Sequence, residues 1–206
     1  MSNSKKMLLV GWDAADWKII APLMQAGHMP ATKSLCERGV SGNITTLFPA
    51  LSPMLWTSIA TGKRPYKHGI YGFYEPTPDN SAVQPMTNIS RRSKAVWNIL
   101  NQHGMKSNVI GWWPSHPAEP INGAMVSDFY HKVPKKPGDS WTLAPNAIHP
   151  PRCLDELAEL RVHPLEMTAD QIVAFIPHAD EVDQETDGRL SQCMRTLAEC
   201  TSIHSA

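Results

Sequence analysis

The stretch Met7–Trp17, "MLLVGWDAADW", places a short apolar run, a glycine and an acidic loop directly before a helical pattern. Met7–Val10 is continuously apolar, which is typical of a strand buried on both faces of a parallel sheet. From Asp16 to Ala26 the apolar residues recur at helical spacing, and Gly27 ends that pattern. The stretch therefore predicts a strand, a loop and a helix in succession.

The same alternation continues along the chain. A proline near the start of one segment and a glycine after its end mark another helix, and β-branched residues mark strands. The expected helices are Met29–Arg38, Pro53–Ala60 and Lys94–Gln102, and the expected strands are Val40–Phe48 and Ser107–Gly111. Strands that alternate with helices indicate an α/β domain with a mainly parallel sheet flanked by helices.

The remaining segments are less regular. Phe73–Arg92 is polar and poorly periodic, so we expect a loop. Asp128–Pro151 is rich in Pro, Lys and Gly, and its length favours a functional insertion or the start of a cap. Helical patterns then follow: Leu154–Leu160, Thr168–Ile176 and a last segment from Asp187, with one face at Leu190, Cys193, Met194, Leu197, Cys200, Thr201 and His204.

Composition limits the class of protein. The chain has 19 basic and 19 acidic residues, so its overall charge gives no reason to expect binding to nucleic acid or to an anionic membrane. The four cysteines form no CxxC pair and are expected to be reduced thiols. The apolar run at the N-terminus is too short for a signal peptide or a membrane span. These features predict a soluble, cytoplasmic protein.

Asp13 is the first candidate for chemistry, because it follows a predicted strand at the sheet edge where α/β proteins place their sites. Asp16 directly precedes the helical pattern and is the better candidate for the helix cap. Asp13 is then left either as a loop residue or as a metal ligand.

Ser52 is the second candidate. It opens "LSPMLWTSIATGKRPYKHGI" (Leu51–Ile70), and a serine before proline at a helix start is an ordinary cap. A helix N-terminus also suits a phosphate, so Ser52 could attack a phosphoryl group if a base or a metal activated it. No Gly-x-Ser-x-Gly motif surrounds Ser52, which disfavours an acyl-transfer hydrolase.

The two stretches together resemble the N-terminal half of the type I phosphodiesterase/nucleotide pyrophosphatase branch of the alkaline phosphatase superfamily. The matching positions are Asp13, Ser52, Thr61-Gly62, Pro65 and His68-Gly69-Ile70. "SNVIGWWPSHPAEPINGAMVSDF" (residues 107–129) also resembles the family's next strand and the loop that leads into its cap. The resemblance implies an alkaline-phosphatase-like fold, with residues 1–130 in the catalytic domain and 131–206 in a cap or insertion.

By this resemblance Ser52 is the nucleophile and a metal ligand, and Asp13 is a metal ligand. The implied cofactors are two divalent ions, zinc with manganese or iron as alternatives. The implied partner is a small phosphorylated substrate, with a nucleotide as one candidate, and neither nucleic acid nor a membrane. Lys63 and Arg64, in a basic cluster with Lys67, are candidate substrate-binding residues or ordinary solvated charges.

Three departures from the family pattern matter. Leu55 stands where eukaryotic-type members have a phosphate-binding Asn, so substrate recognition must differ. Pro53 and Trp56 do not fit the sulfatase pattern. The family's later Asp and His metal ligands have no counterpart in strand context, and the chain stops within a helical pattern, so we expect a truncated domain.

Other polar and aromatic residues have ordinary structural explanations. His68 is expected to hold its turn by hydrogen bonding, the pair Trp112 and Trp113 to pack, and Asp128 to be either a site residue or a cap. The acidic stretch with His178, Asp180, Asp183 and Asp187 reads as a solvated loop rather than a metal site.

Three functions stay open at this point. The first is a metal-dependent phosphohydrolase that cleaves phosphodiester, pyrophosphate or phosphomonoester bonds through a phosphoseryl intermediate. The second is a phosphotransferase or phosphomutase of the same superfamily. The third is a catalytically silent fragment that lacks the later metal ligands.

Overall fold

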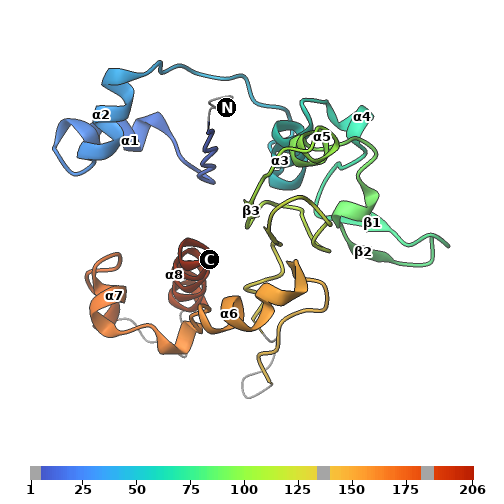
Figure 1. Cartoon of the computed structure of the whole chain (residues 1–206). Coiled ribbons are helices and arrows are strands. Elements are labelled where there is room, and N and C mark those ends of the chain that lie inside the picture. Colours follow the sequence, from blue (N-terminus) through green and yellow to red (C-terminus); the bar gives the residue numbers. More distant parts are fainter. Residues whose placement is uncertain (1–5, 134–139, 182–187) are drawn as a thin grey trace. The chain divides into compact units, whose positions relative to one another are not determined.

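The computed structural model describes residues 6–133, 140–181 and 188–206 of the chain. These residues form two compact units, residues 1–48 and 49–206, and each unit is described by itself. The unit boundary is not the predicted domain limit near residue 130, which stays a prediction. Figure 1 follows the chain through both units.

Unit 1 contains two helices, α1 (Trp17–Gln25) and α2 (Pro30–Arg38), as predicted. The Asp16 carboxylate accepts a hydrogen bond from the Lys18 N–H at 2.8 Å, so Asp16 is the cap of α1. No described residue of this unit is buried. The two helices therefore contact each other without building a core.

The two strands predicted in unit 1 are wrong for this structure. Met7–Val10 and Val40–Phe48 form no strand, and their large apolar side chains are mostly exposed, with Met7 at 93% and Phe48 at 98%. A strand needs a neighbour for its backbone N–H and C=O groups. The described residues of unit 1 offer no such neighbour, although the sequence pattern is that of a buried strand.

Unit 2 contains the remaining elements (Figure 1). Its α-helices are α3 (Ser52–Thr61), α4 (Pro65–His68), α5 (Val96–Gln102), α6 (Leu154–Glu159), α7 (Ala169–Val173) and α8 (Gly188–Ser205). Its 3-10 turns are η1 (Asn88–Ser90), η2 (Pro151–Cys153), η3 (Pro164–Glu166) and η4 (Ala179–Glu181). Each helix of the sequence prediction for this unit is present, with boundaries shifted by a few residues.

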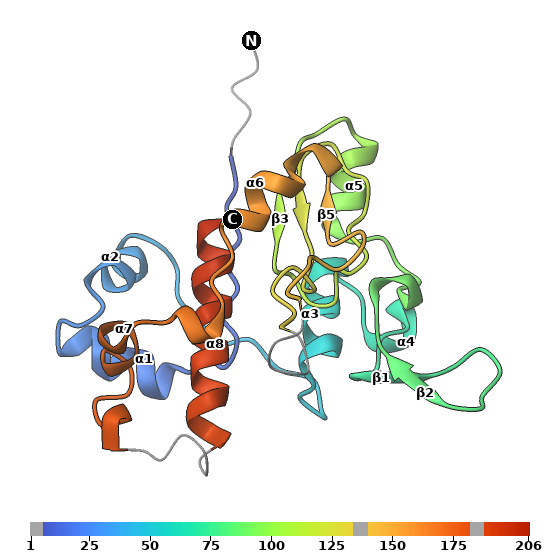
Figure 2. The same cartoon turned by 90° about the horizontal axis from the view of Figure 1, so that it is seen from below.

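A three-stranded sheet lies in unit 2, in the order β3 (Val109–Ile110), β4 (Met125–Val126) and β5 (Ile148–His149). Figure 2 shows β3 and β5 at its edges. The β3–β4 pairing is parallel and the β4–β5 pairing antiparallel. The architecture is thus mixed α/β, while a mainly parallel sheet is not seen among the described residues.

Two predicted irregular segments contain regular structure. Phe73–Arg92 was expected to be a loop, but it contains an antiparallel hairpin, β1 (Tyr74–Pro76) with β2 (Val83–Pro85), followed by η1. Asp128–Pro151 was expected to be a functional insertion or the start of a cap, but its last part contains β5, which pairs with β4. Single pairs of short, proline-containing strands carry too little alternation to be recognised from sequence.

Three apolar clusters hold unit 2 together. The first joins α3 and α5 to the sheet and contains Ala60, Ala95, Trp97, Val109, Ile121 and Met125. The second lies around β4, β5 and α6 and contains Val126, Tyr130, Ala147, Ile148 and Leu157. The third joins η3, α7 and α8 and contains Met167, Ile172, Ala179, Leu190 and Ala198.

The buried face of α8 differs from the predicted one. Leu190, Ala198 and Ser202 are buried, whereas Cys193 and Cys200 are exposed. The Ser202 hydroxyl accepts a hydrogen bond from the Val162 N–H at 2.8 Å, so a polar contact helps to define this face. All four cysteines lie among the described residues and are unpaired, as predicted.

Candidate functional site

Ser52 is the first residue of α3, and its side chain is half-buried. The residue that caps the helix is Leu51, in extended conformation, and no side chain caps this end. The interpretation of Ser52 as a cap is therefore wrong, because the helix starts one residue earlier than a serine cap requires. The Ser52 hydroxyl has no hydrogen-bond partner among the described residues.

The start of α3 has free backbone donors. The first intrahelical bond of the turn runs from the Leu55 N–H to the Leu51 carbonyl at 3.0 Å. The N–H groups of Ser52 and Met54 come earlier in the chain than this bond and so have no intrahelical acceptor, and Pro53 has no N–H group. These two N–H groups have no backbone partner within the part of the chain that the structure describes, and they lie with the positive end of the helix dipole beside the Ser52 hydroxyl, an arrangement that favours a phosphate.

Packing and hydrogen bonds keep α3 rigid. Pro53, Met54, Thr57, Ala60 and Thr61 are its buried residues. The hydroxyls of Thr57, Ser58 and Thr61 each donate to the carbonyl four residues earlier, at 2.7–2.8 Å. Gly62 ends the helix with φ +63°, a conformation that glycine adopts without strain.

His68 ties α4 to α3 and is fully buried. Its Nδ1 accepts the Ile70 N–H at 3.1 Å, and its Nε2 lies 3.0 Å from the Ser58 hydroxyl. Since that hydroxyl donates to the Met54 carbonyl, Nε2 carries the proton and is the donor. Burial, with a smaller effect of Arg91, lowers the pKa of His68. The structural role expected for His68 is confirmed.

Lys63 and Arg64 are exposed and follow the C-terminal end of α3, at the opposite end of the helix from Ser52. The ten residues of α3 span about 15 Å. The two basic side chains therefore do not belong to the same helix terminus as the candidate nucleophile.

Asp13 lies in unit 1, exposed in the turn before α1. Ala14 beside it has a φ of +55°. Because Asp16 caps α1, Asp13 is free of that task, as the sequence predicted. Ser52 belongs to unit 2, so a joint site of Asp13 and Ser52 stays a prediction.

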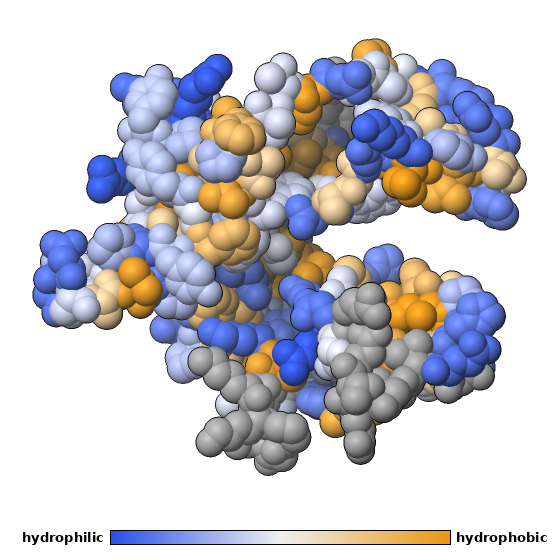
Figure 3. All heavy atoms as spheres, turned by 180° about the vertical axis from the view of Figure 1, so that it is seen from behind, coloured by the Kyte–Doolittle hydropathy of each residue, from blue (hydrophilic) through white to orange (hydrophobic). Residues whose placement is uncertain are grey.

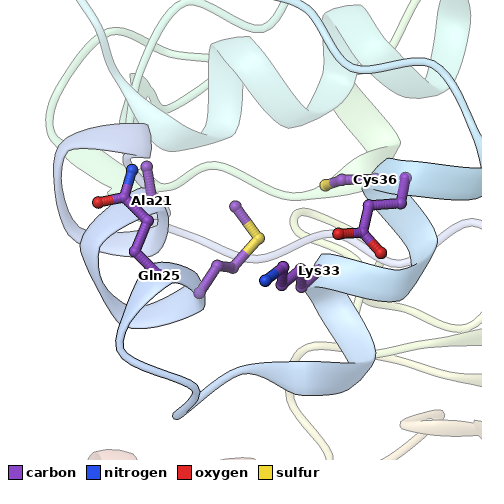
Figure 4. Close-up of a pocket in the computed structure, with 6 residues that line it drawn as sticks. Ala21, Gln25, Lys33 and Cys36 are labelled. Carbon is purple, nitrogen blue, oxygen red and sulfur yellow. The ribbon is translucent and has the colours of Figure 1, made fainter.

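A shallow pocket of about 290 Å³ lies between α1 and α2. Ala21, Met24, Gln25, Lys33, Cys36 and Glu37 line it. Figure 4 shows Lys33 and Cys36 of α2 pointing toward α1. Asp13 is not among the lining residues, so this pocket is separate from the candidate metal ligand.

Asp128 was left open by the sequence, and the structure shows what it contacts. It follows β4, and its carboxylate accepts the N–H groups of Ser115 and His116, both at 2.8 Å, and the Ser115 hydroxyl at 3.2 Å. Burial raises the pKa of Asp128 despite these bonds. Asp128 therefore fixes the loop after β3 to the end of β4, the neighbouring parallel strand.

A second polar network escaped the sequence analysis. Both oxygens of the Glu119 carboxylate accept hydrogen bonds from the Arg91 guanidinium, each at 2.7 Å. The same carboxylate also accepts the Trp97 indole N–H at 2.6 Å. Only 6% of the Arg91 side chain is exposed. Arg91 and Glu119 are 28 residues apart in the chain, so no local sequence pattern predicts their contact.

The remaining candidates have structural positions. Trp112 packs against Trp56 and Trp97 and donates its indole N–H to the Trp56 carbonyl, as expected for packing. The His178 Nδ1 lies 3.4 Å from the Glu181 carboxylate, and both side chains are exposed. Asp183 and Asp187 lie outside the described residues. Within the described ranges, no three His, Cys, Asp or Glu side chains are grouped as a metal would require.

A family model for type I phosphodiesterase / nucleotide pyrophosphatase matches residues 7–193. The chain belongs to this family. Phosphoester hydrolysis is the chemistry that membership of the type I phosphodiesterase/nucleotide pyrophosphatase family indicates. The match includes Asp13, Ser52 and the α3–α4 corner. No curated protein and no solved structure matched the chain.

None of the described helices of this phosphodiesterase-family chain combines the length and apolar character needed to cross a bilayer.

Proposed function

We propose that this chain carries the nucleophile of a metal-dependent phosphohydrolase that cleaves phosphodiester, pyrophosphate or phosphomonoester bonds through a phosphoseryl intermediate. Family membership supports the reaction class. The observation that carries the assignment of Ser52 is its position as the first residue of α3, with a hydroxyl that caps nothing. Beside it lie N–H groups without intrahelical acceptors.

In the proposed reaction the Ser52 oxygen attacks phosphorus, a new O–P bond forms, and the leaving oxygen departs with the electron pair of the broken bond. The serine proton passes to solvent. The N–H groups of Ser52 and Met54 face the oxygens of the bound phosphoryl group, where negative charge must be stabilised. Water then cleaves the Ser52–phosphate bond and regenerates the hydroxyl.

Asp13 and Ser52 are the residues that would hold the two divalent ions, zinc with manganese or iron as alternatives. Bound ions would supply stabilisation of the serine alkoxide and of the phosphoryl charge. Two oxygen ligands suit such ions, but the described residues group no three metal-binding side chains. Asp13 and Ser52 therefore make up a partial ligand set.

The substrate in this proposal is a small phosphorylated molecule, with a nucleotide as one candidate. Lys63 and Arg64 lie beyond the far end of α3, about 15 Å along the helix from Ser52. In this geometry they would contact a distal part of an extended substrate and not the reacting phosphate. Leu55, on the first turn of α3, leaves phosphate binding to the backbone N–H groups.

The test is hydrolysis of bis(p-nitrophenyl) phosphate by the chain with added zinc or manganese. Ser52→Ala should lower metal-dependent turnover about a thousandfold or more, as expected for loss of a nucleophile. Ser41→Ala, which removes an exposed hydroxyl from unit 1, should leave turnover unchanged. Turnover that survives Ser52→Ala would remove Ser52 from the mechanism. No metal-dependent turnover by the wild-type chain would favour the silent-fragment alternative.

Metal binding is tested separately by calorimetric titration with zinc. Asp13→Asn and Ser52→Ala should each weaken binding at least tenfold, whereas Asp16→Asn, a change at the neighbouring cap, should not. Equal affinity of all four proteins would show that zinc binds elsewhere.

A further inference from the structure

A buried hydroxyl contacts the first turn of α3 from inside unit 2. The Thr57 hydroxyl donates to the Pro53 carbonyl at 2.7 Å. Thr57 is 2% exposed, so it takes no part in the surface of Figure 3, where hydrophilic and hydrophobic residues of unit 2 intermingle. A buried threonine in a helix often satisfies its hydroxyl by such a bond to the carbonyl four residues earlier. Whether the bond has a further effect depends on the peptide that receives it.

The receiving peptide is one of the two that present an N–H group at the start of α3. The Pro53 carbonyl and the Met54 N–H belong to the same planar peptide unit. The Met54 N–H has no backbone partner within the part of the chain that the structure describes. A carbonyl that accepts a hydrogen bond becomes more polarised, and the N–H of the same peptide becomes a stronger donor. The Thr57 hydroxyl therefore acts on an N–H group beside Ser52.

The other two hydroxyls that bond back along α3 contact different peptides. Ser58 donates to the Met54 carbonyl at 2.8 Å, and the N–H of that peptide, from Leu55, is already used in the first intrahelical bond. Thr61 donates to the Thr57 carbonyl at 2.7 Å, one turn further from Ser52. Among these three hydroxyls, that of Thr57 contacts the peptide whose N–H has no acceptor within the helix.

The helix holds this geometry before any anion binds. Pro53 and Thr57 are both among the buried residues of α3. The β-branched side chain of Thr57 has few rotamers in a helix. His68 of α4 also contacts the Ser58 hydroxyl at 3.0 Å, which ties the same helix to its neighbour. The Met54 N–H is thus oriented in advance, and an oriented donor stabilises charge at a lower cost.

We propose, on the basis of the phosphoryl transfer proposed above, that Thr57 is a positioning residue for the phosphate at Ser52. Its hydroxyl polarises and orients the Pro53–Met54 peptide, so that the Met54 N–H donates more strongly to a phosphoryl oxygen. Thr57 itself touches neither the phosphate nor the reacting atoms. A neighbouring hydrogen bond strengthens a donor by about 10–30%, which for a charged acceptor corresponds to a change in affinity of about two- to threefold.

The experiment is a titration of the isotope-labelled full chain with inorganic phosphate, followed by the NMR chemical shift of the Met54 amide. The wild type should show a saturable shift. Thr57→Val keeps the shape of the side chain without its hydroxyl and should raise the Kd about two- to threefold, as should Thr57→Ala. Thr57→Ser keeps the hydroxyl and should restore the wild-type Kd.

Thr61→Val is the matched control. It removes the same kind of bond, at 2.7 Å, and also the oxygen that accepts the Lys63 N–H at 3.2 Å. It therefore loses at least as many hydrogen bonds as Thr57→Val, yet its Kd for phosphate should equal that of the wild type. An equal rise in Kd for both valine variants would overturn the proposal, and so would a wild-type Met54 amide that does not respond to phosphate.

Ser52→Ala separates this inference from the proposed function. It should abolish turnover of bis(p-nitrophenyl) phosphate, whereas the Met54 amide should keep its response to phosphate and its dependence on Thr57. Turnover that survives Ser52→Ala would overturn the assignment of the nucleophile and leave the phosphate titration to decide the role of Thr57. Loss of turnover in Ser52→Ala with equal Kd values for the wild type and Thr57→Val would overturn the role of Thr57 and leave the nucleophile in place.

Discussion

Protonation of His68 should loosen the α3–α4 corner, and the direction follows from its hydrogen bonds. The neutral ring uses both nitrogens, Nδ1 as acceptor from Ile70 and Nε2 as donor to Ser58. A proton on Nδ1 would face the Ile70 N–H and place a buried charge near Arg91. The folded state therefore disfavours the charged ring.

The sign of the pH effect is fixed by linkage. Burial and Arg91 lower the pKa of His68 in the folded state below its usual 6.5. Between the lowered pKa and 6.5 the unfolded chain binds more protons, so the free energy of unfolding falls as the pH falls through this window. The contribution is fully present above pH 6.5. Burial also lowers the pKa values of His116 and His131, so a variant is needed to isolate His68.

His68→Gln provides that variant. The glutamine amide can still donate to Ser58 but cannot be protonated, and it loses the acceptor for Ile70. One lost buried hydrogen bond costs about 1–2 kcal/mol at pH 7.5. His68→Ala loses both bonds and leaves a cavity, which together cost about 3–4 kcal/mol.

The assay is urea unfolding at pH 7.5, 6.5 and 5.5, followed by tryptophan fluorescence, since Trp56, Trp97 and Trp112 are in contact within unit 2. His68→Gln should show a smaller loss of stability at low pH than the wild type. His103→Gln, a change at an exposed histidine after α5, should keep the wild-type loss. If His68→Gln and the wild type lose the same stability between pH 7.5 and 5.5, the reasoning about His68 is refuted.

Two further substitutions test the packing around the candidate site. Glu119→Gln should destabilise unit 2 by about 3 kcal/mol, because it leaves the nearly buried Arg91 guanidinium without a carboxylate. Urea unfolding measures this loss, with Glu159→Gln as the control. If both variants lose the same free energy of unfolding, the network around Glu119 contributes nothing. Gly69→Ala should cost about 2 kcal/mol, since φ is +81° and a Cβ would lie 3.1 Å from Arg92 side-chain atoms and the Ser90 carbonyl. Gly104→Ala, with φ +69° and open space, should cost about 1 kcal/mol, and equal thermal shifts for the two glycine variants would contradict the steric argument.

The sequence by itself determined the helices and indicated the family. Periodicity and end signals predicted the helices around Trp17–Gln25, Pro30–Arg38 and Ser52–Thr61, because amphipathic spacing, prolines and glycines act over a few residues. The stretches around Asp13 and from Leu51 to Ile70 resemble the type I phosphodiesterase family, and the family model that matches residues 7–193 confirms this resemblance. The assignment of Asp16 as a cap followed from position alone.

Only the tertiary structure decided which segments pair as strands, which side chains are exposed and which polar side chains form hydrogen bonds. Met7–Val10 has the pattern of a buried strand, yet whether it pairs depends on a neighbour that its own residues cannot specify. The hairpin face of Tyr74 and Val83 is outward because Glu75, on the other face, accepts hydrogen bonds from Gln84 and from Ser90 of η1. The Ser52 hydroxyl does not cap α3, because the cap residue of this helix is Leu51. His68 is a hydrogen-bonding residue because both of its ring nitrogens meet partners, Ser58 and Ile70. These outcomes arise from contacts between segments distant along the chain, and such contacts are set by packing and not by local pattern.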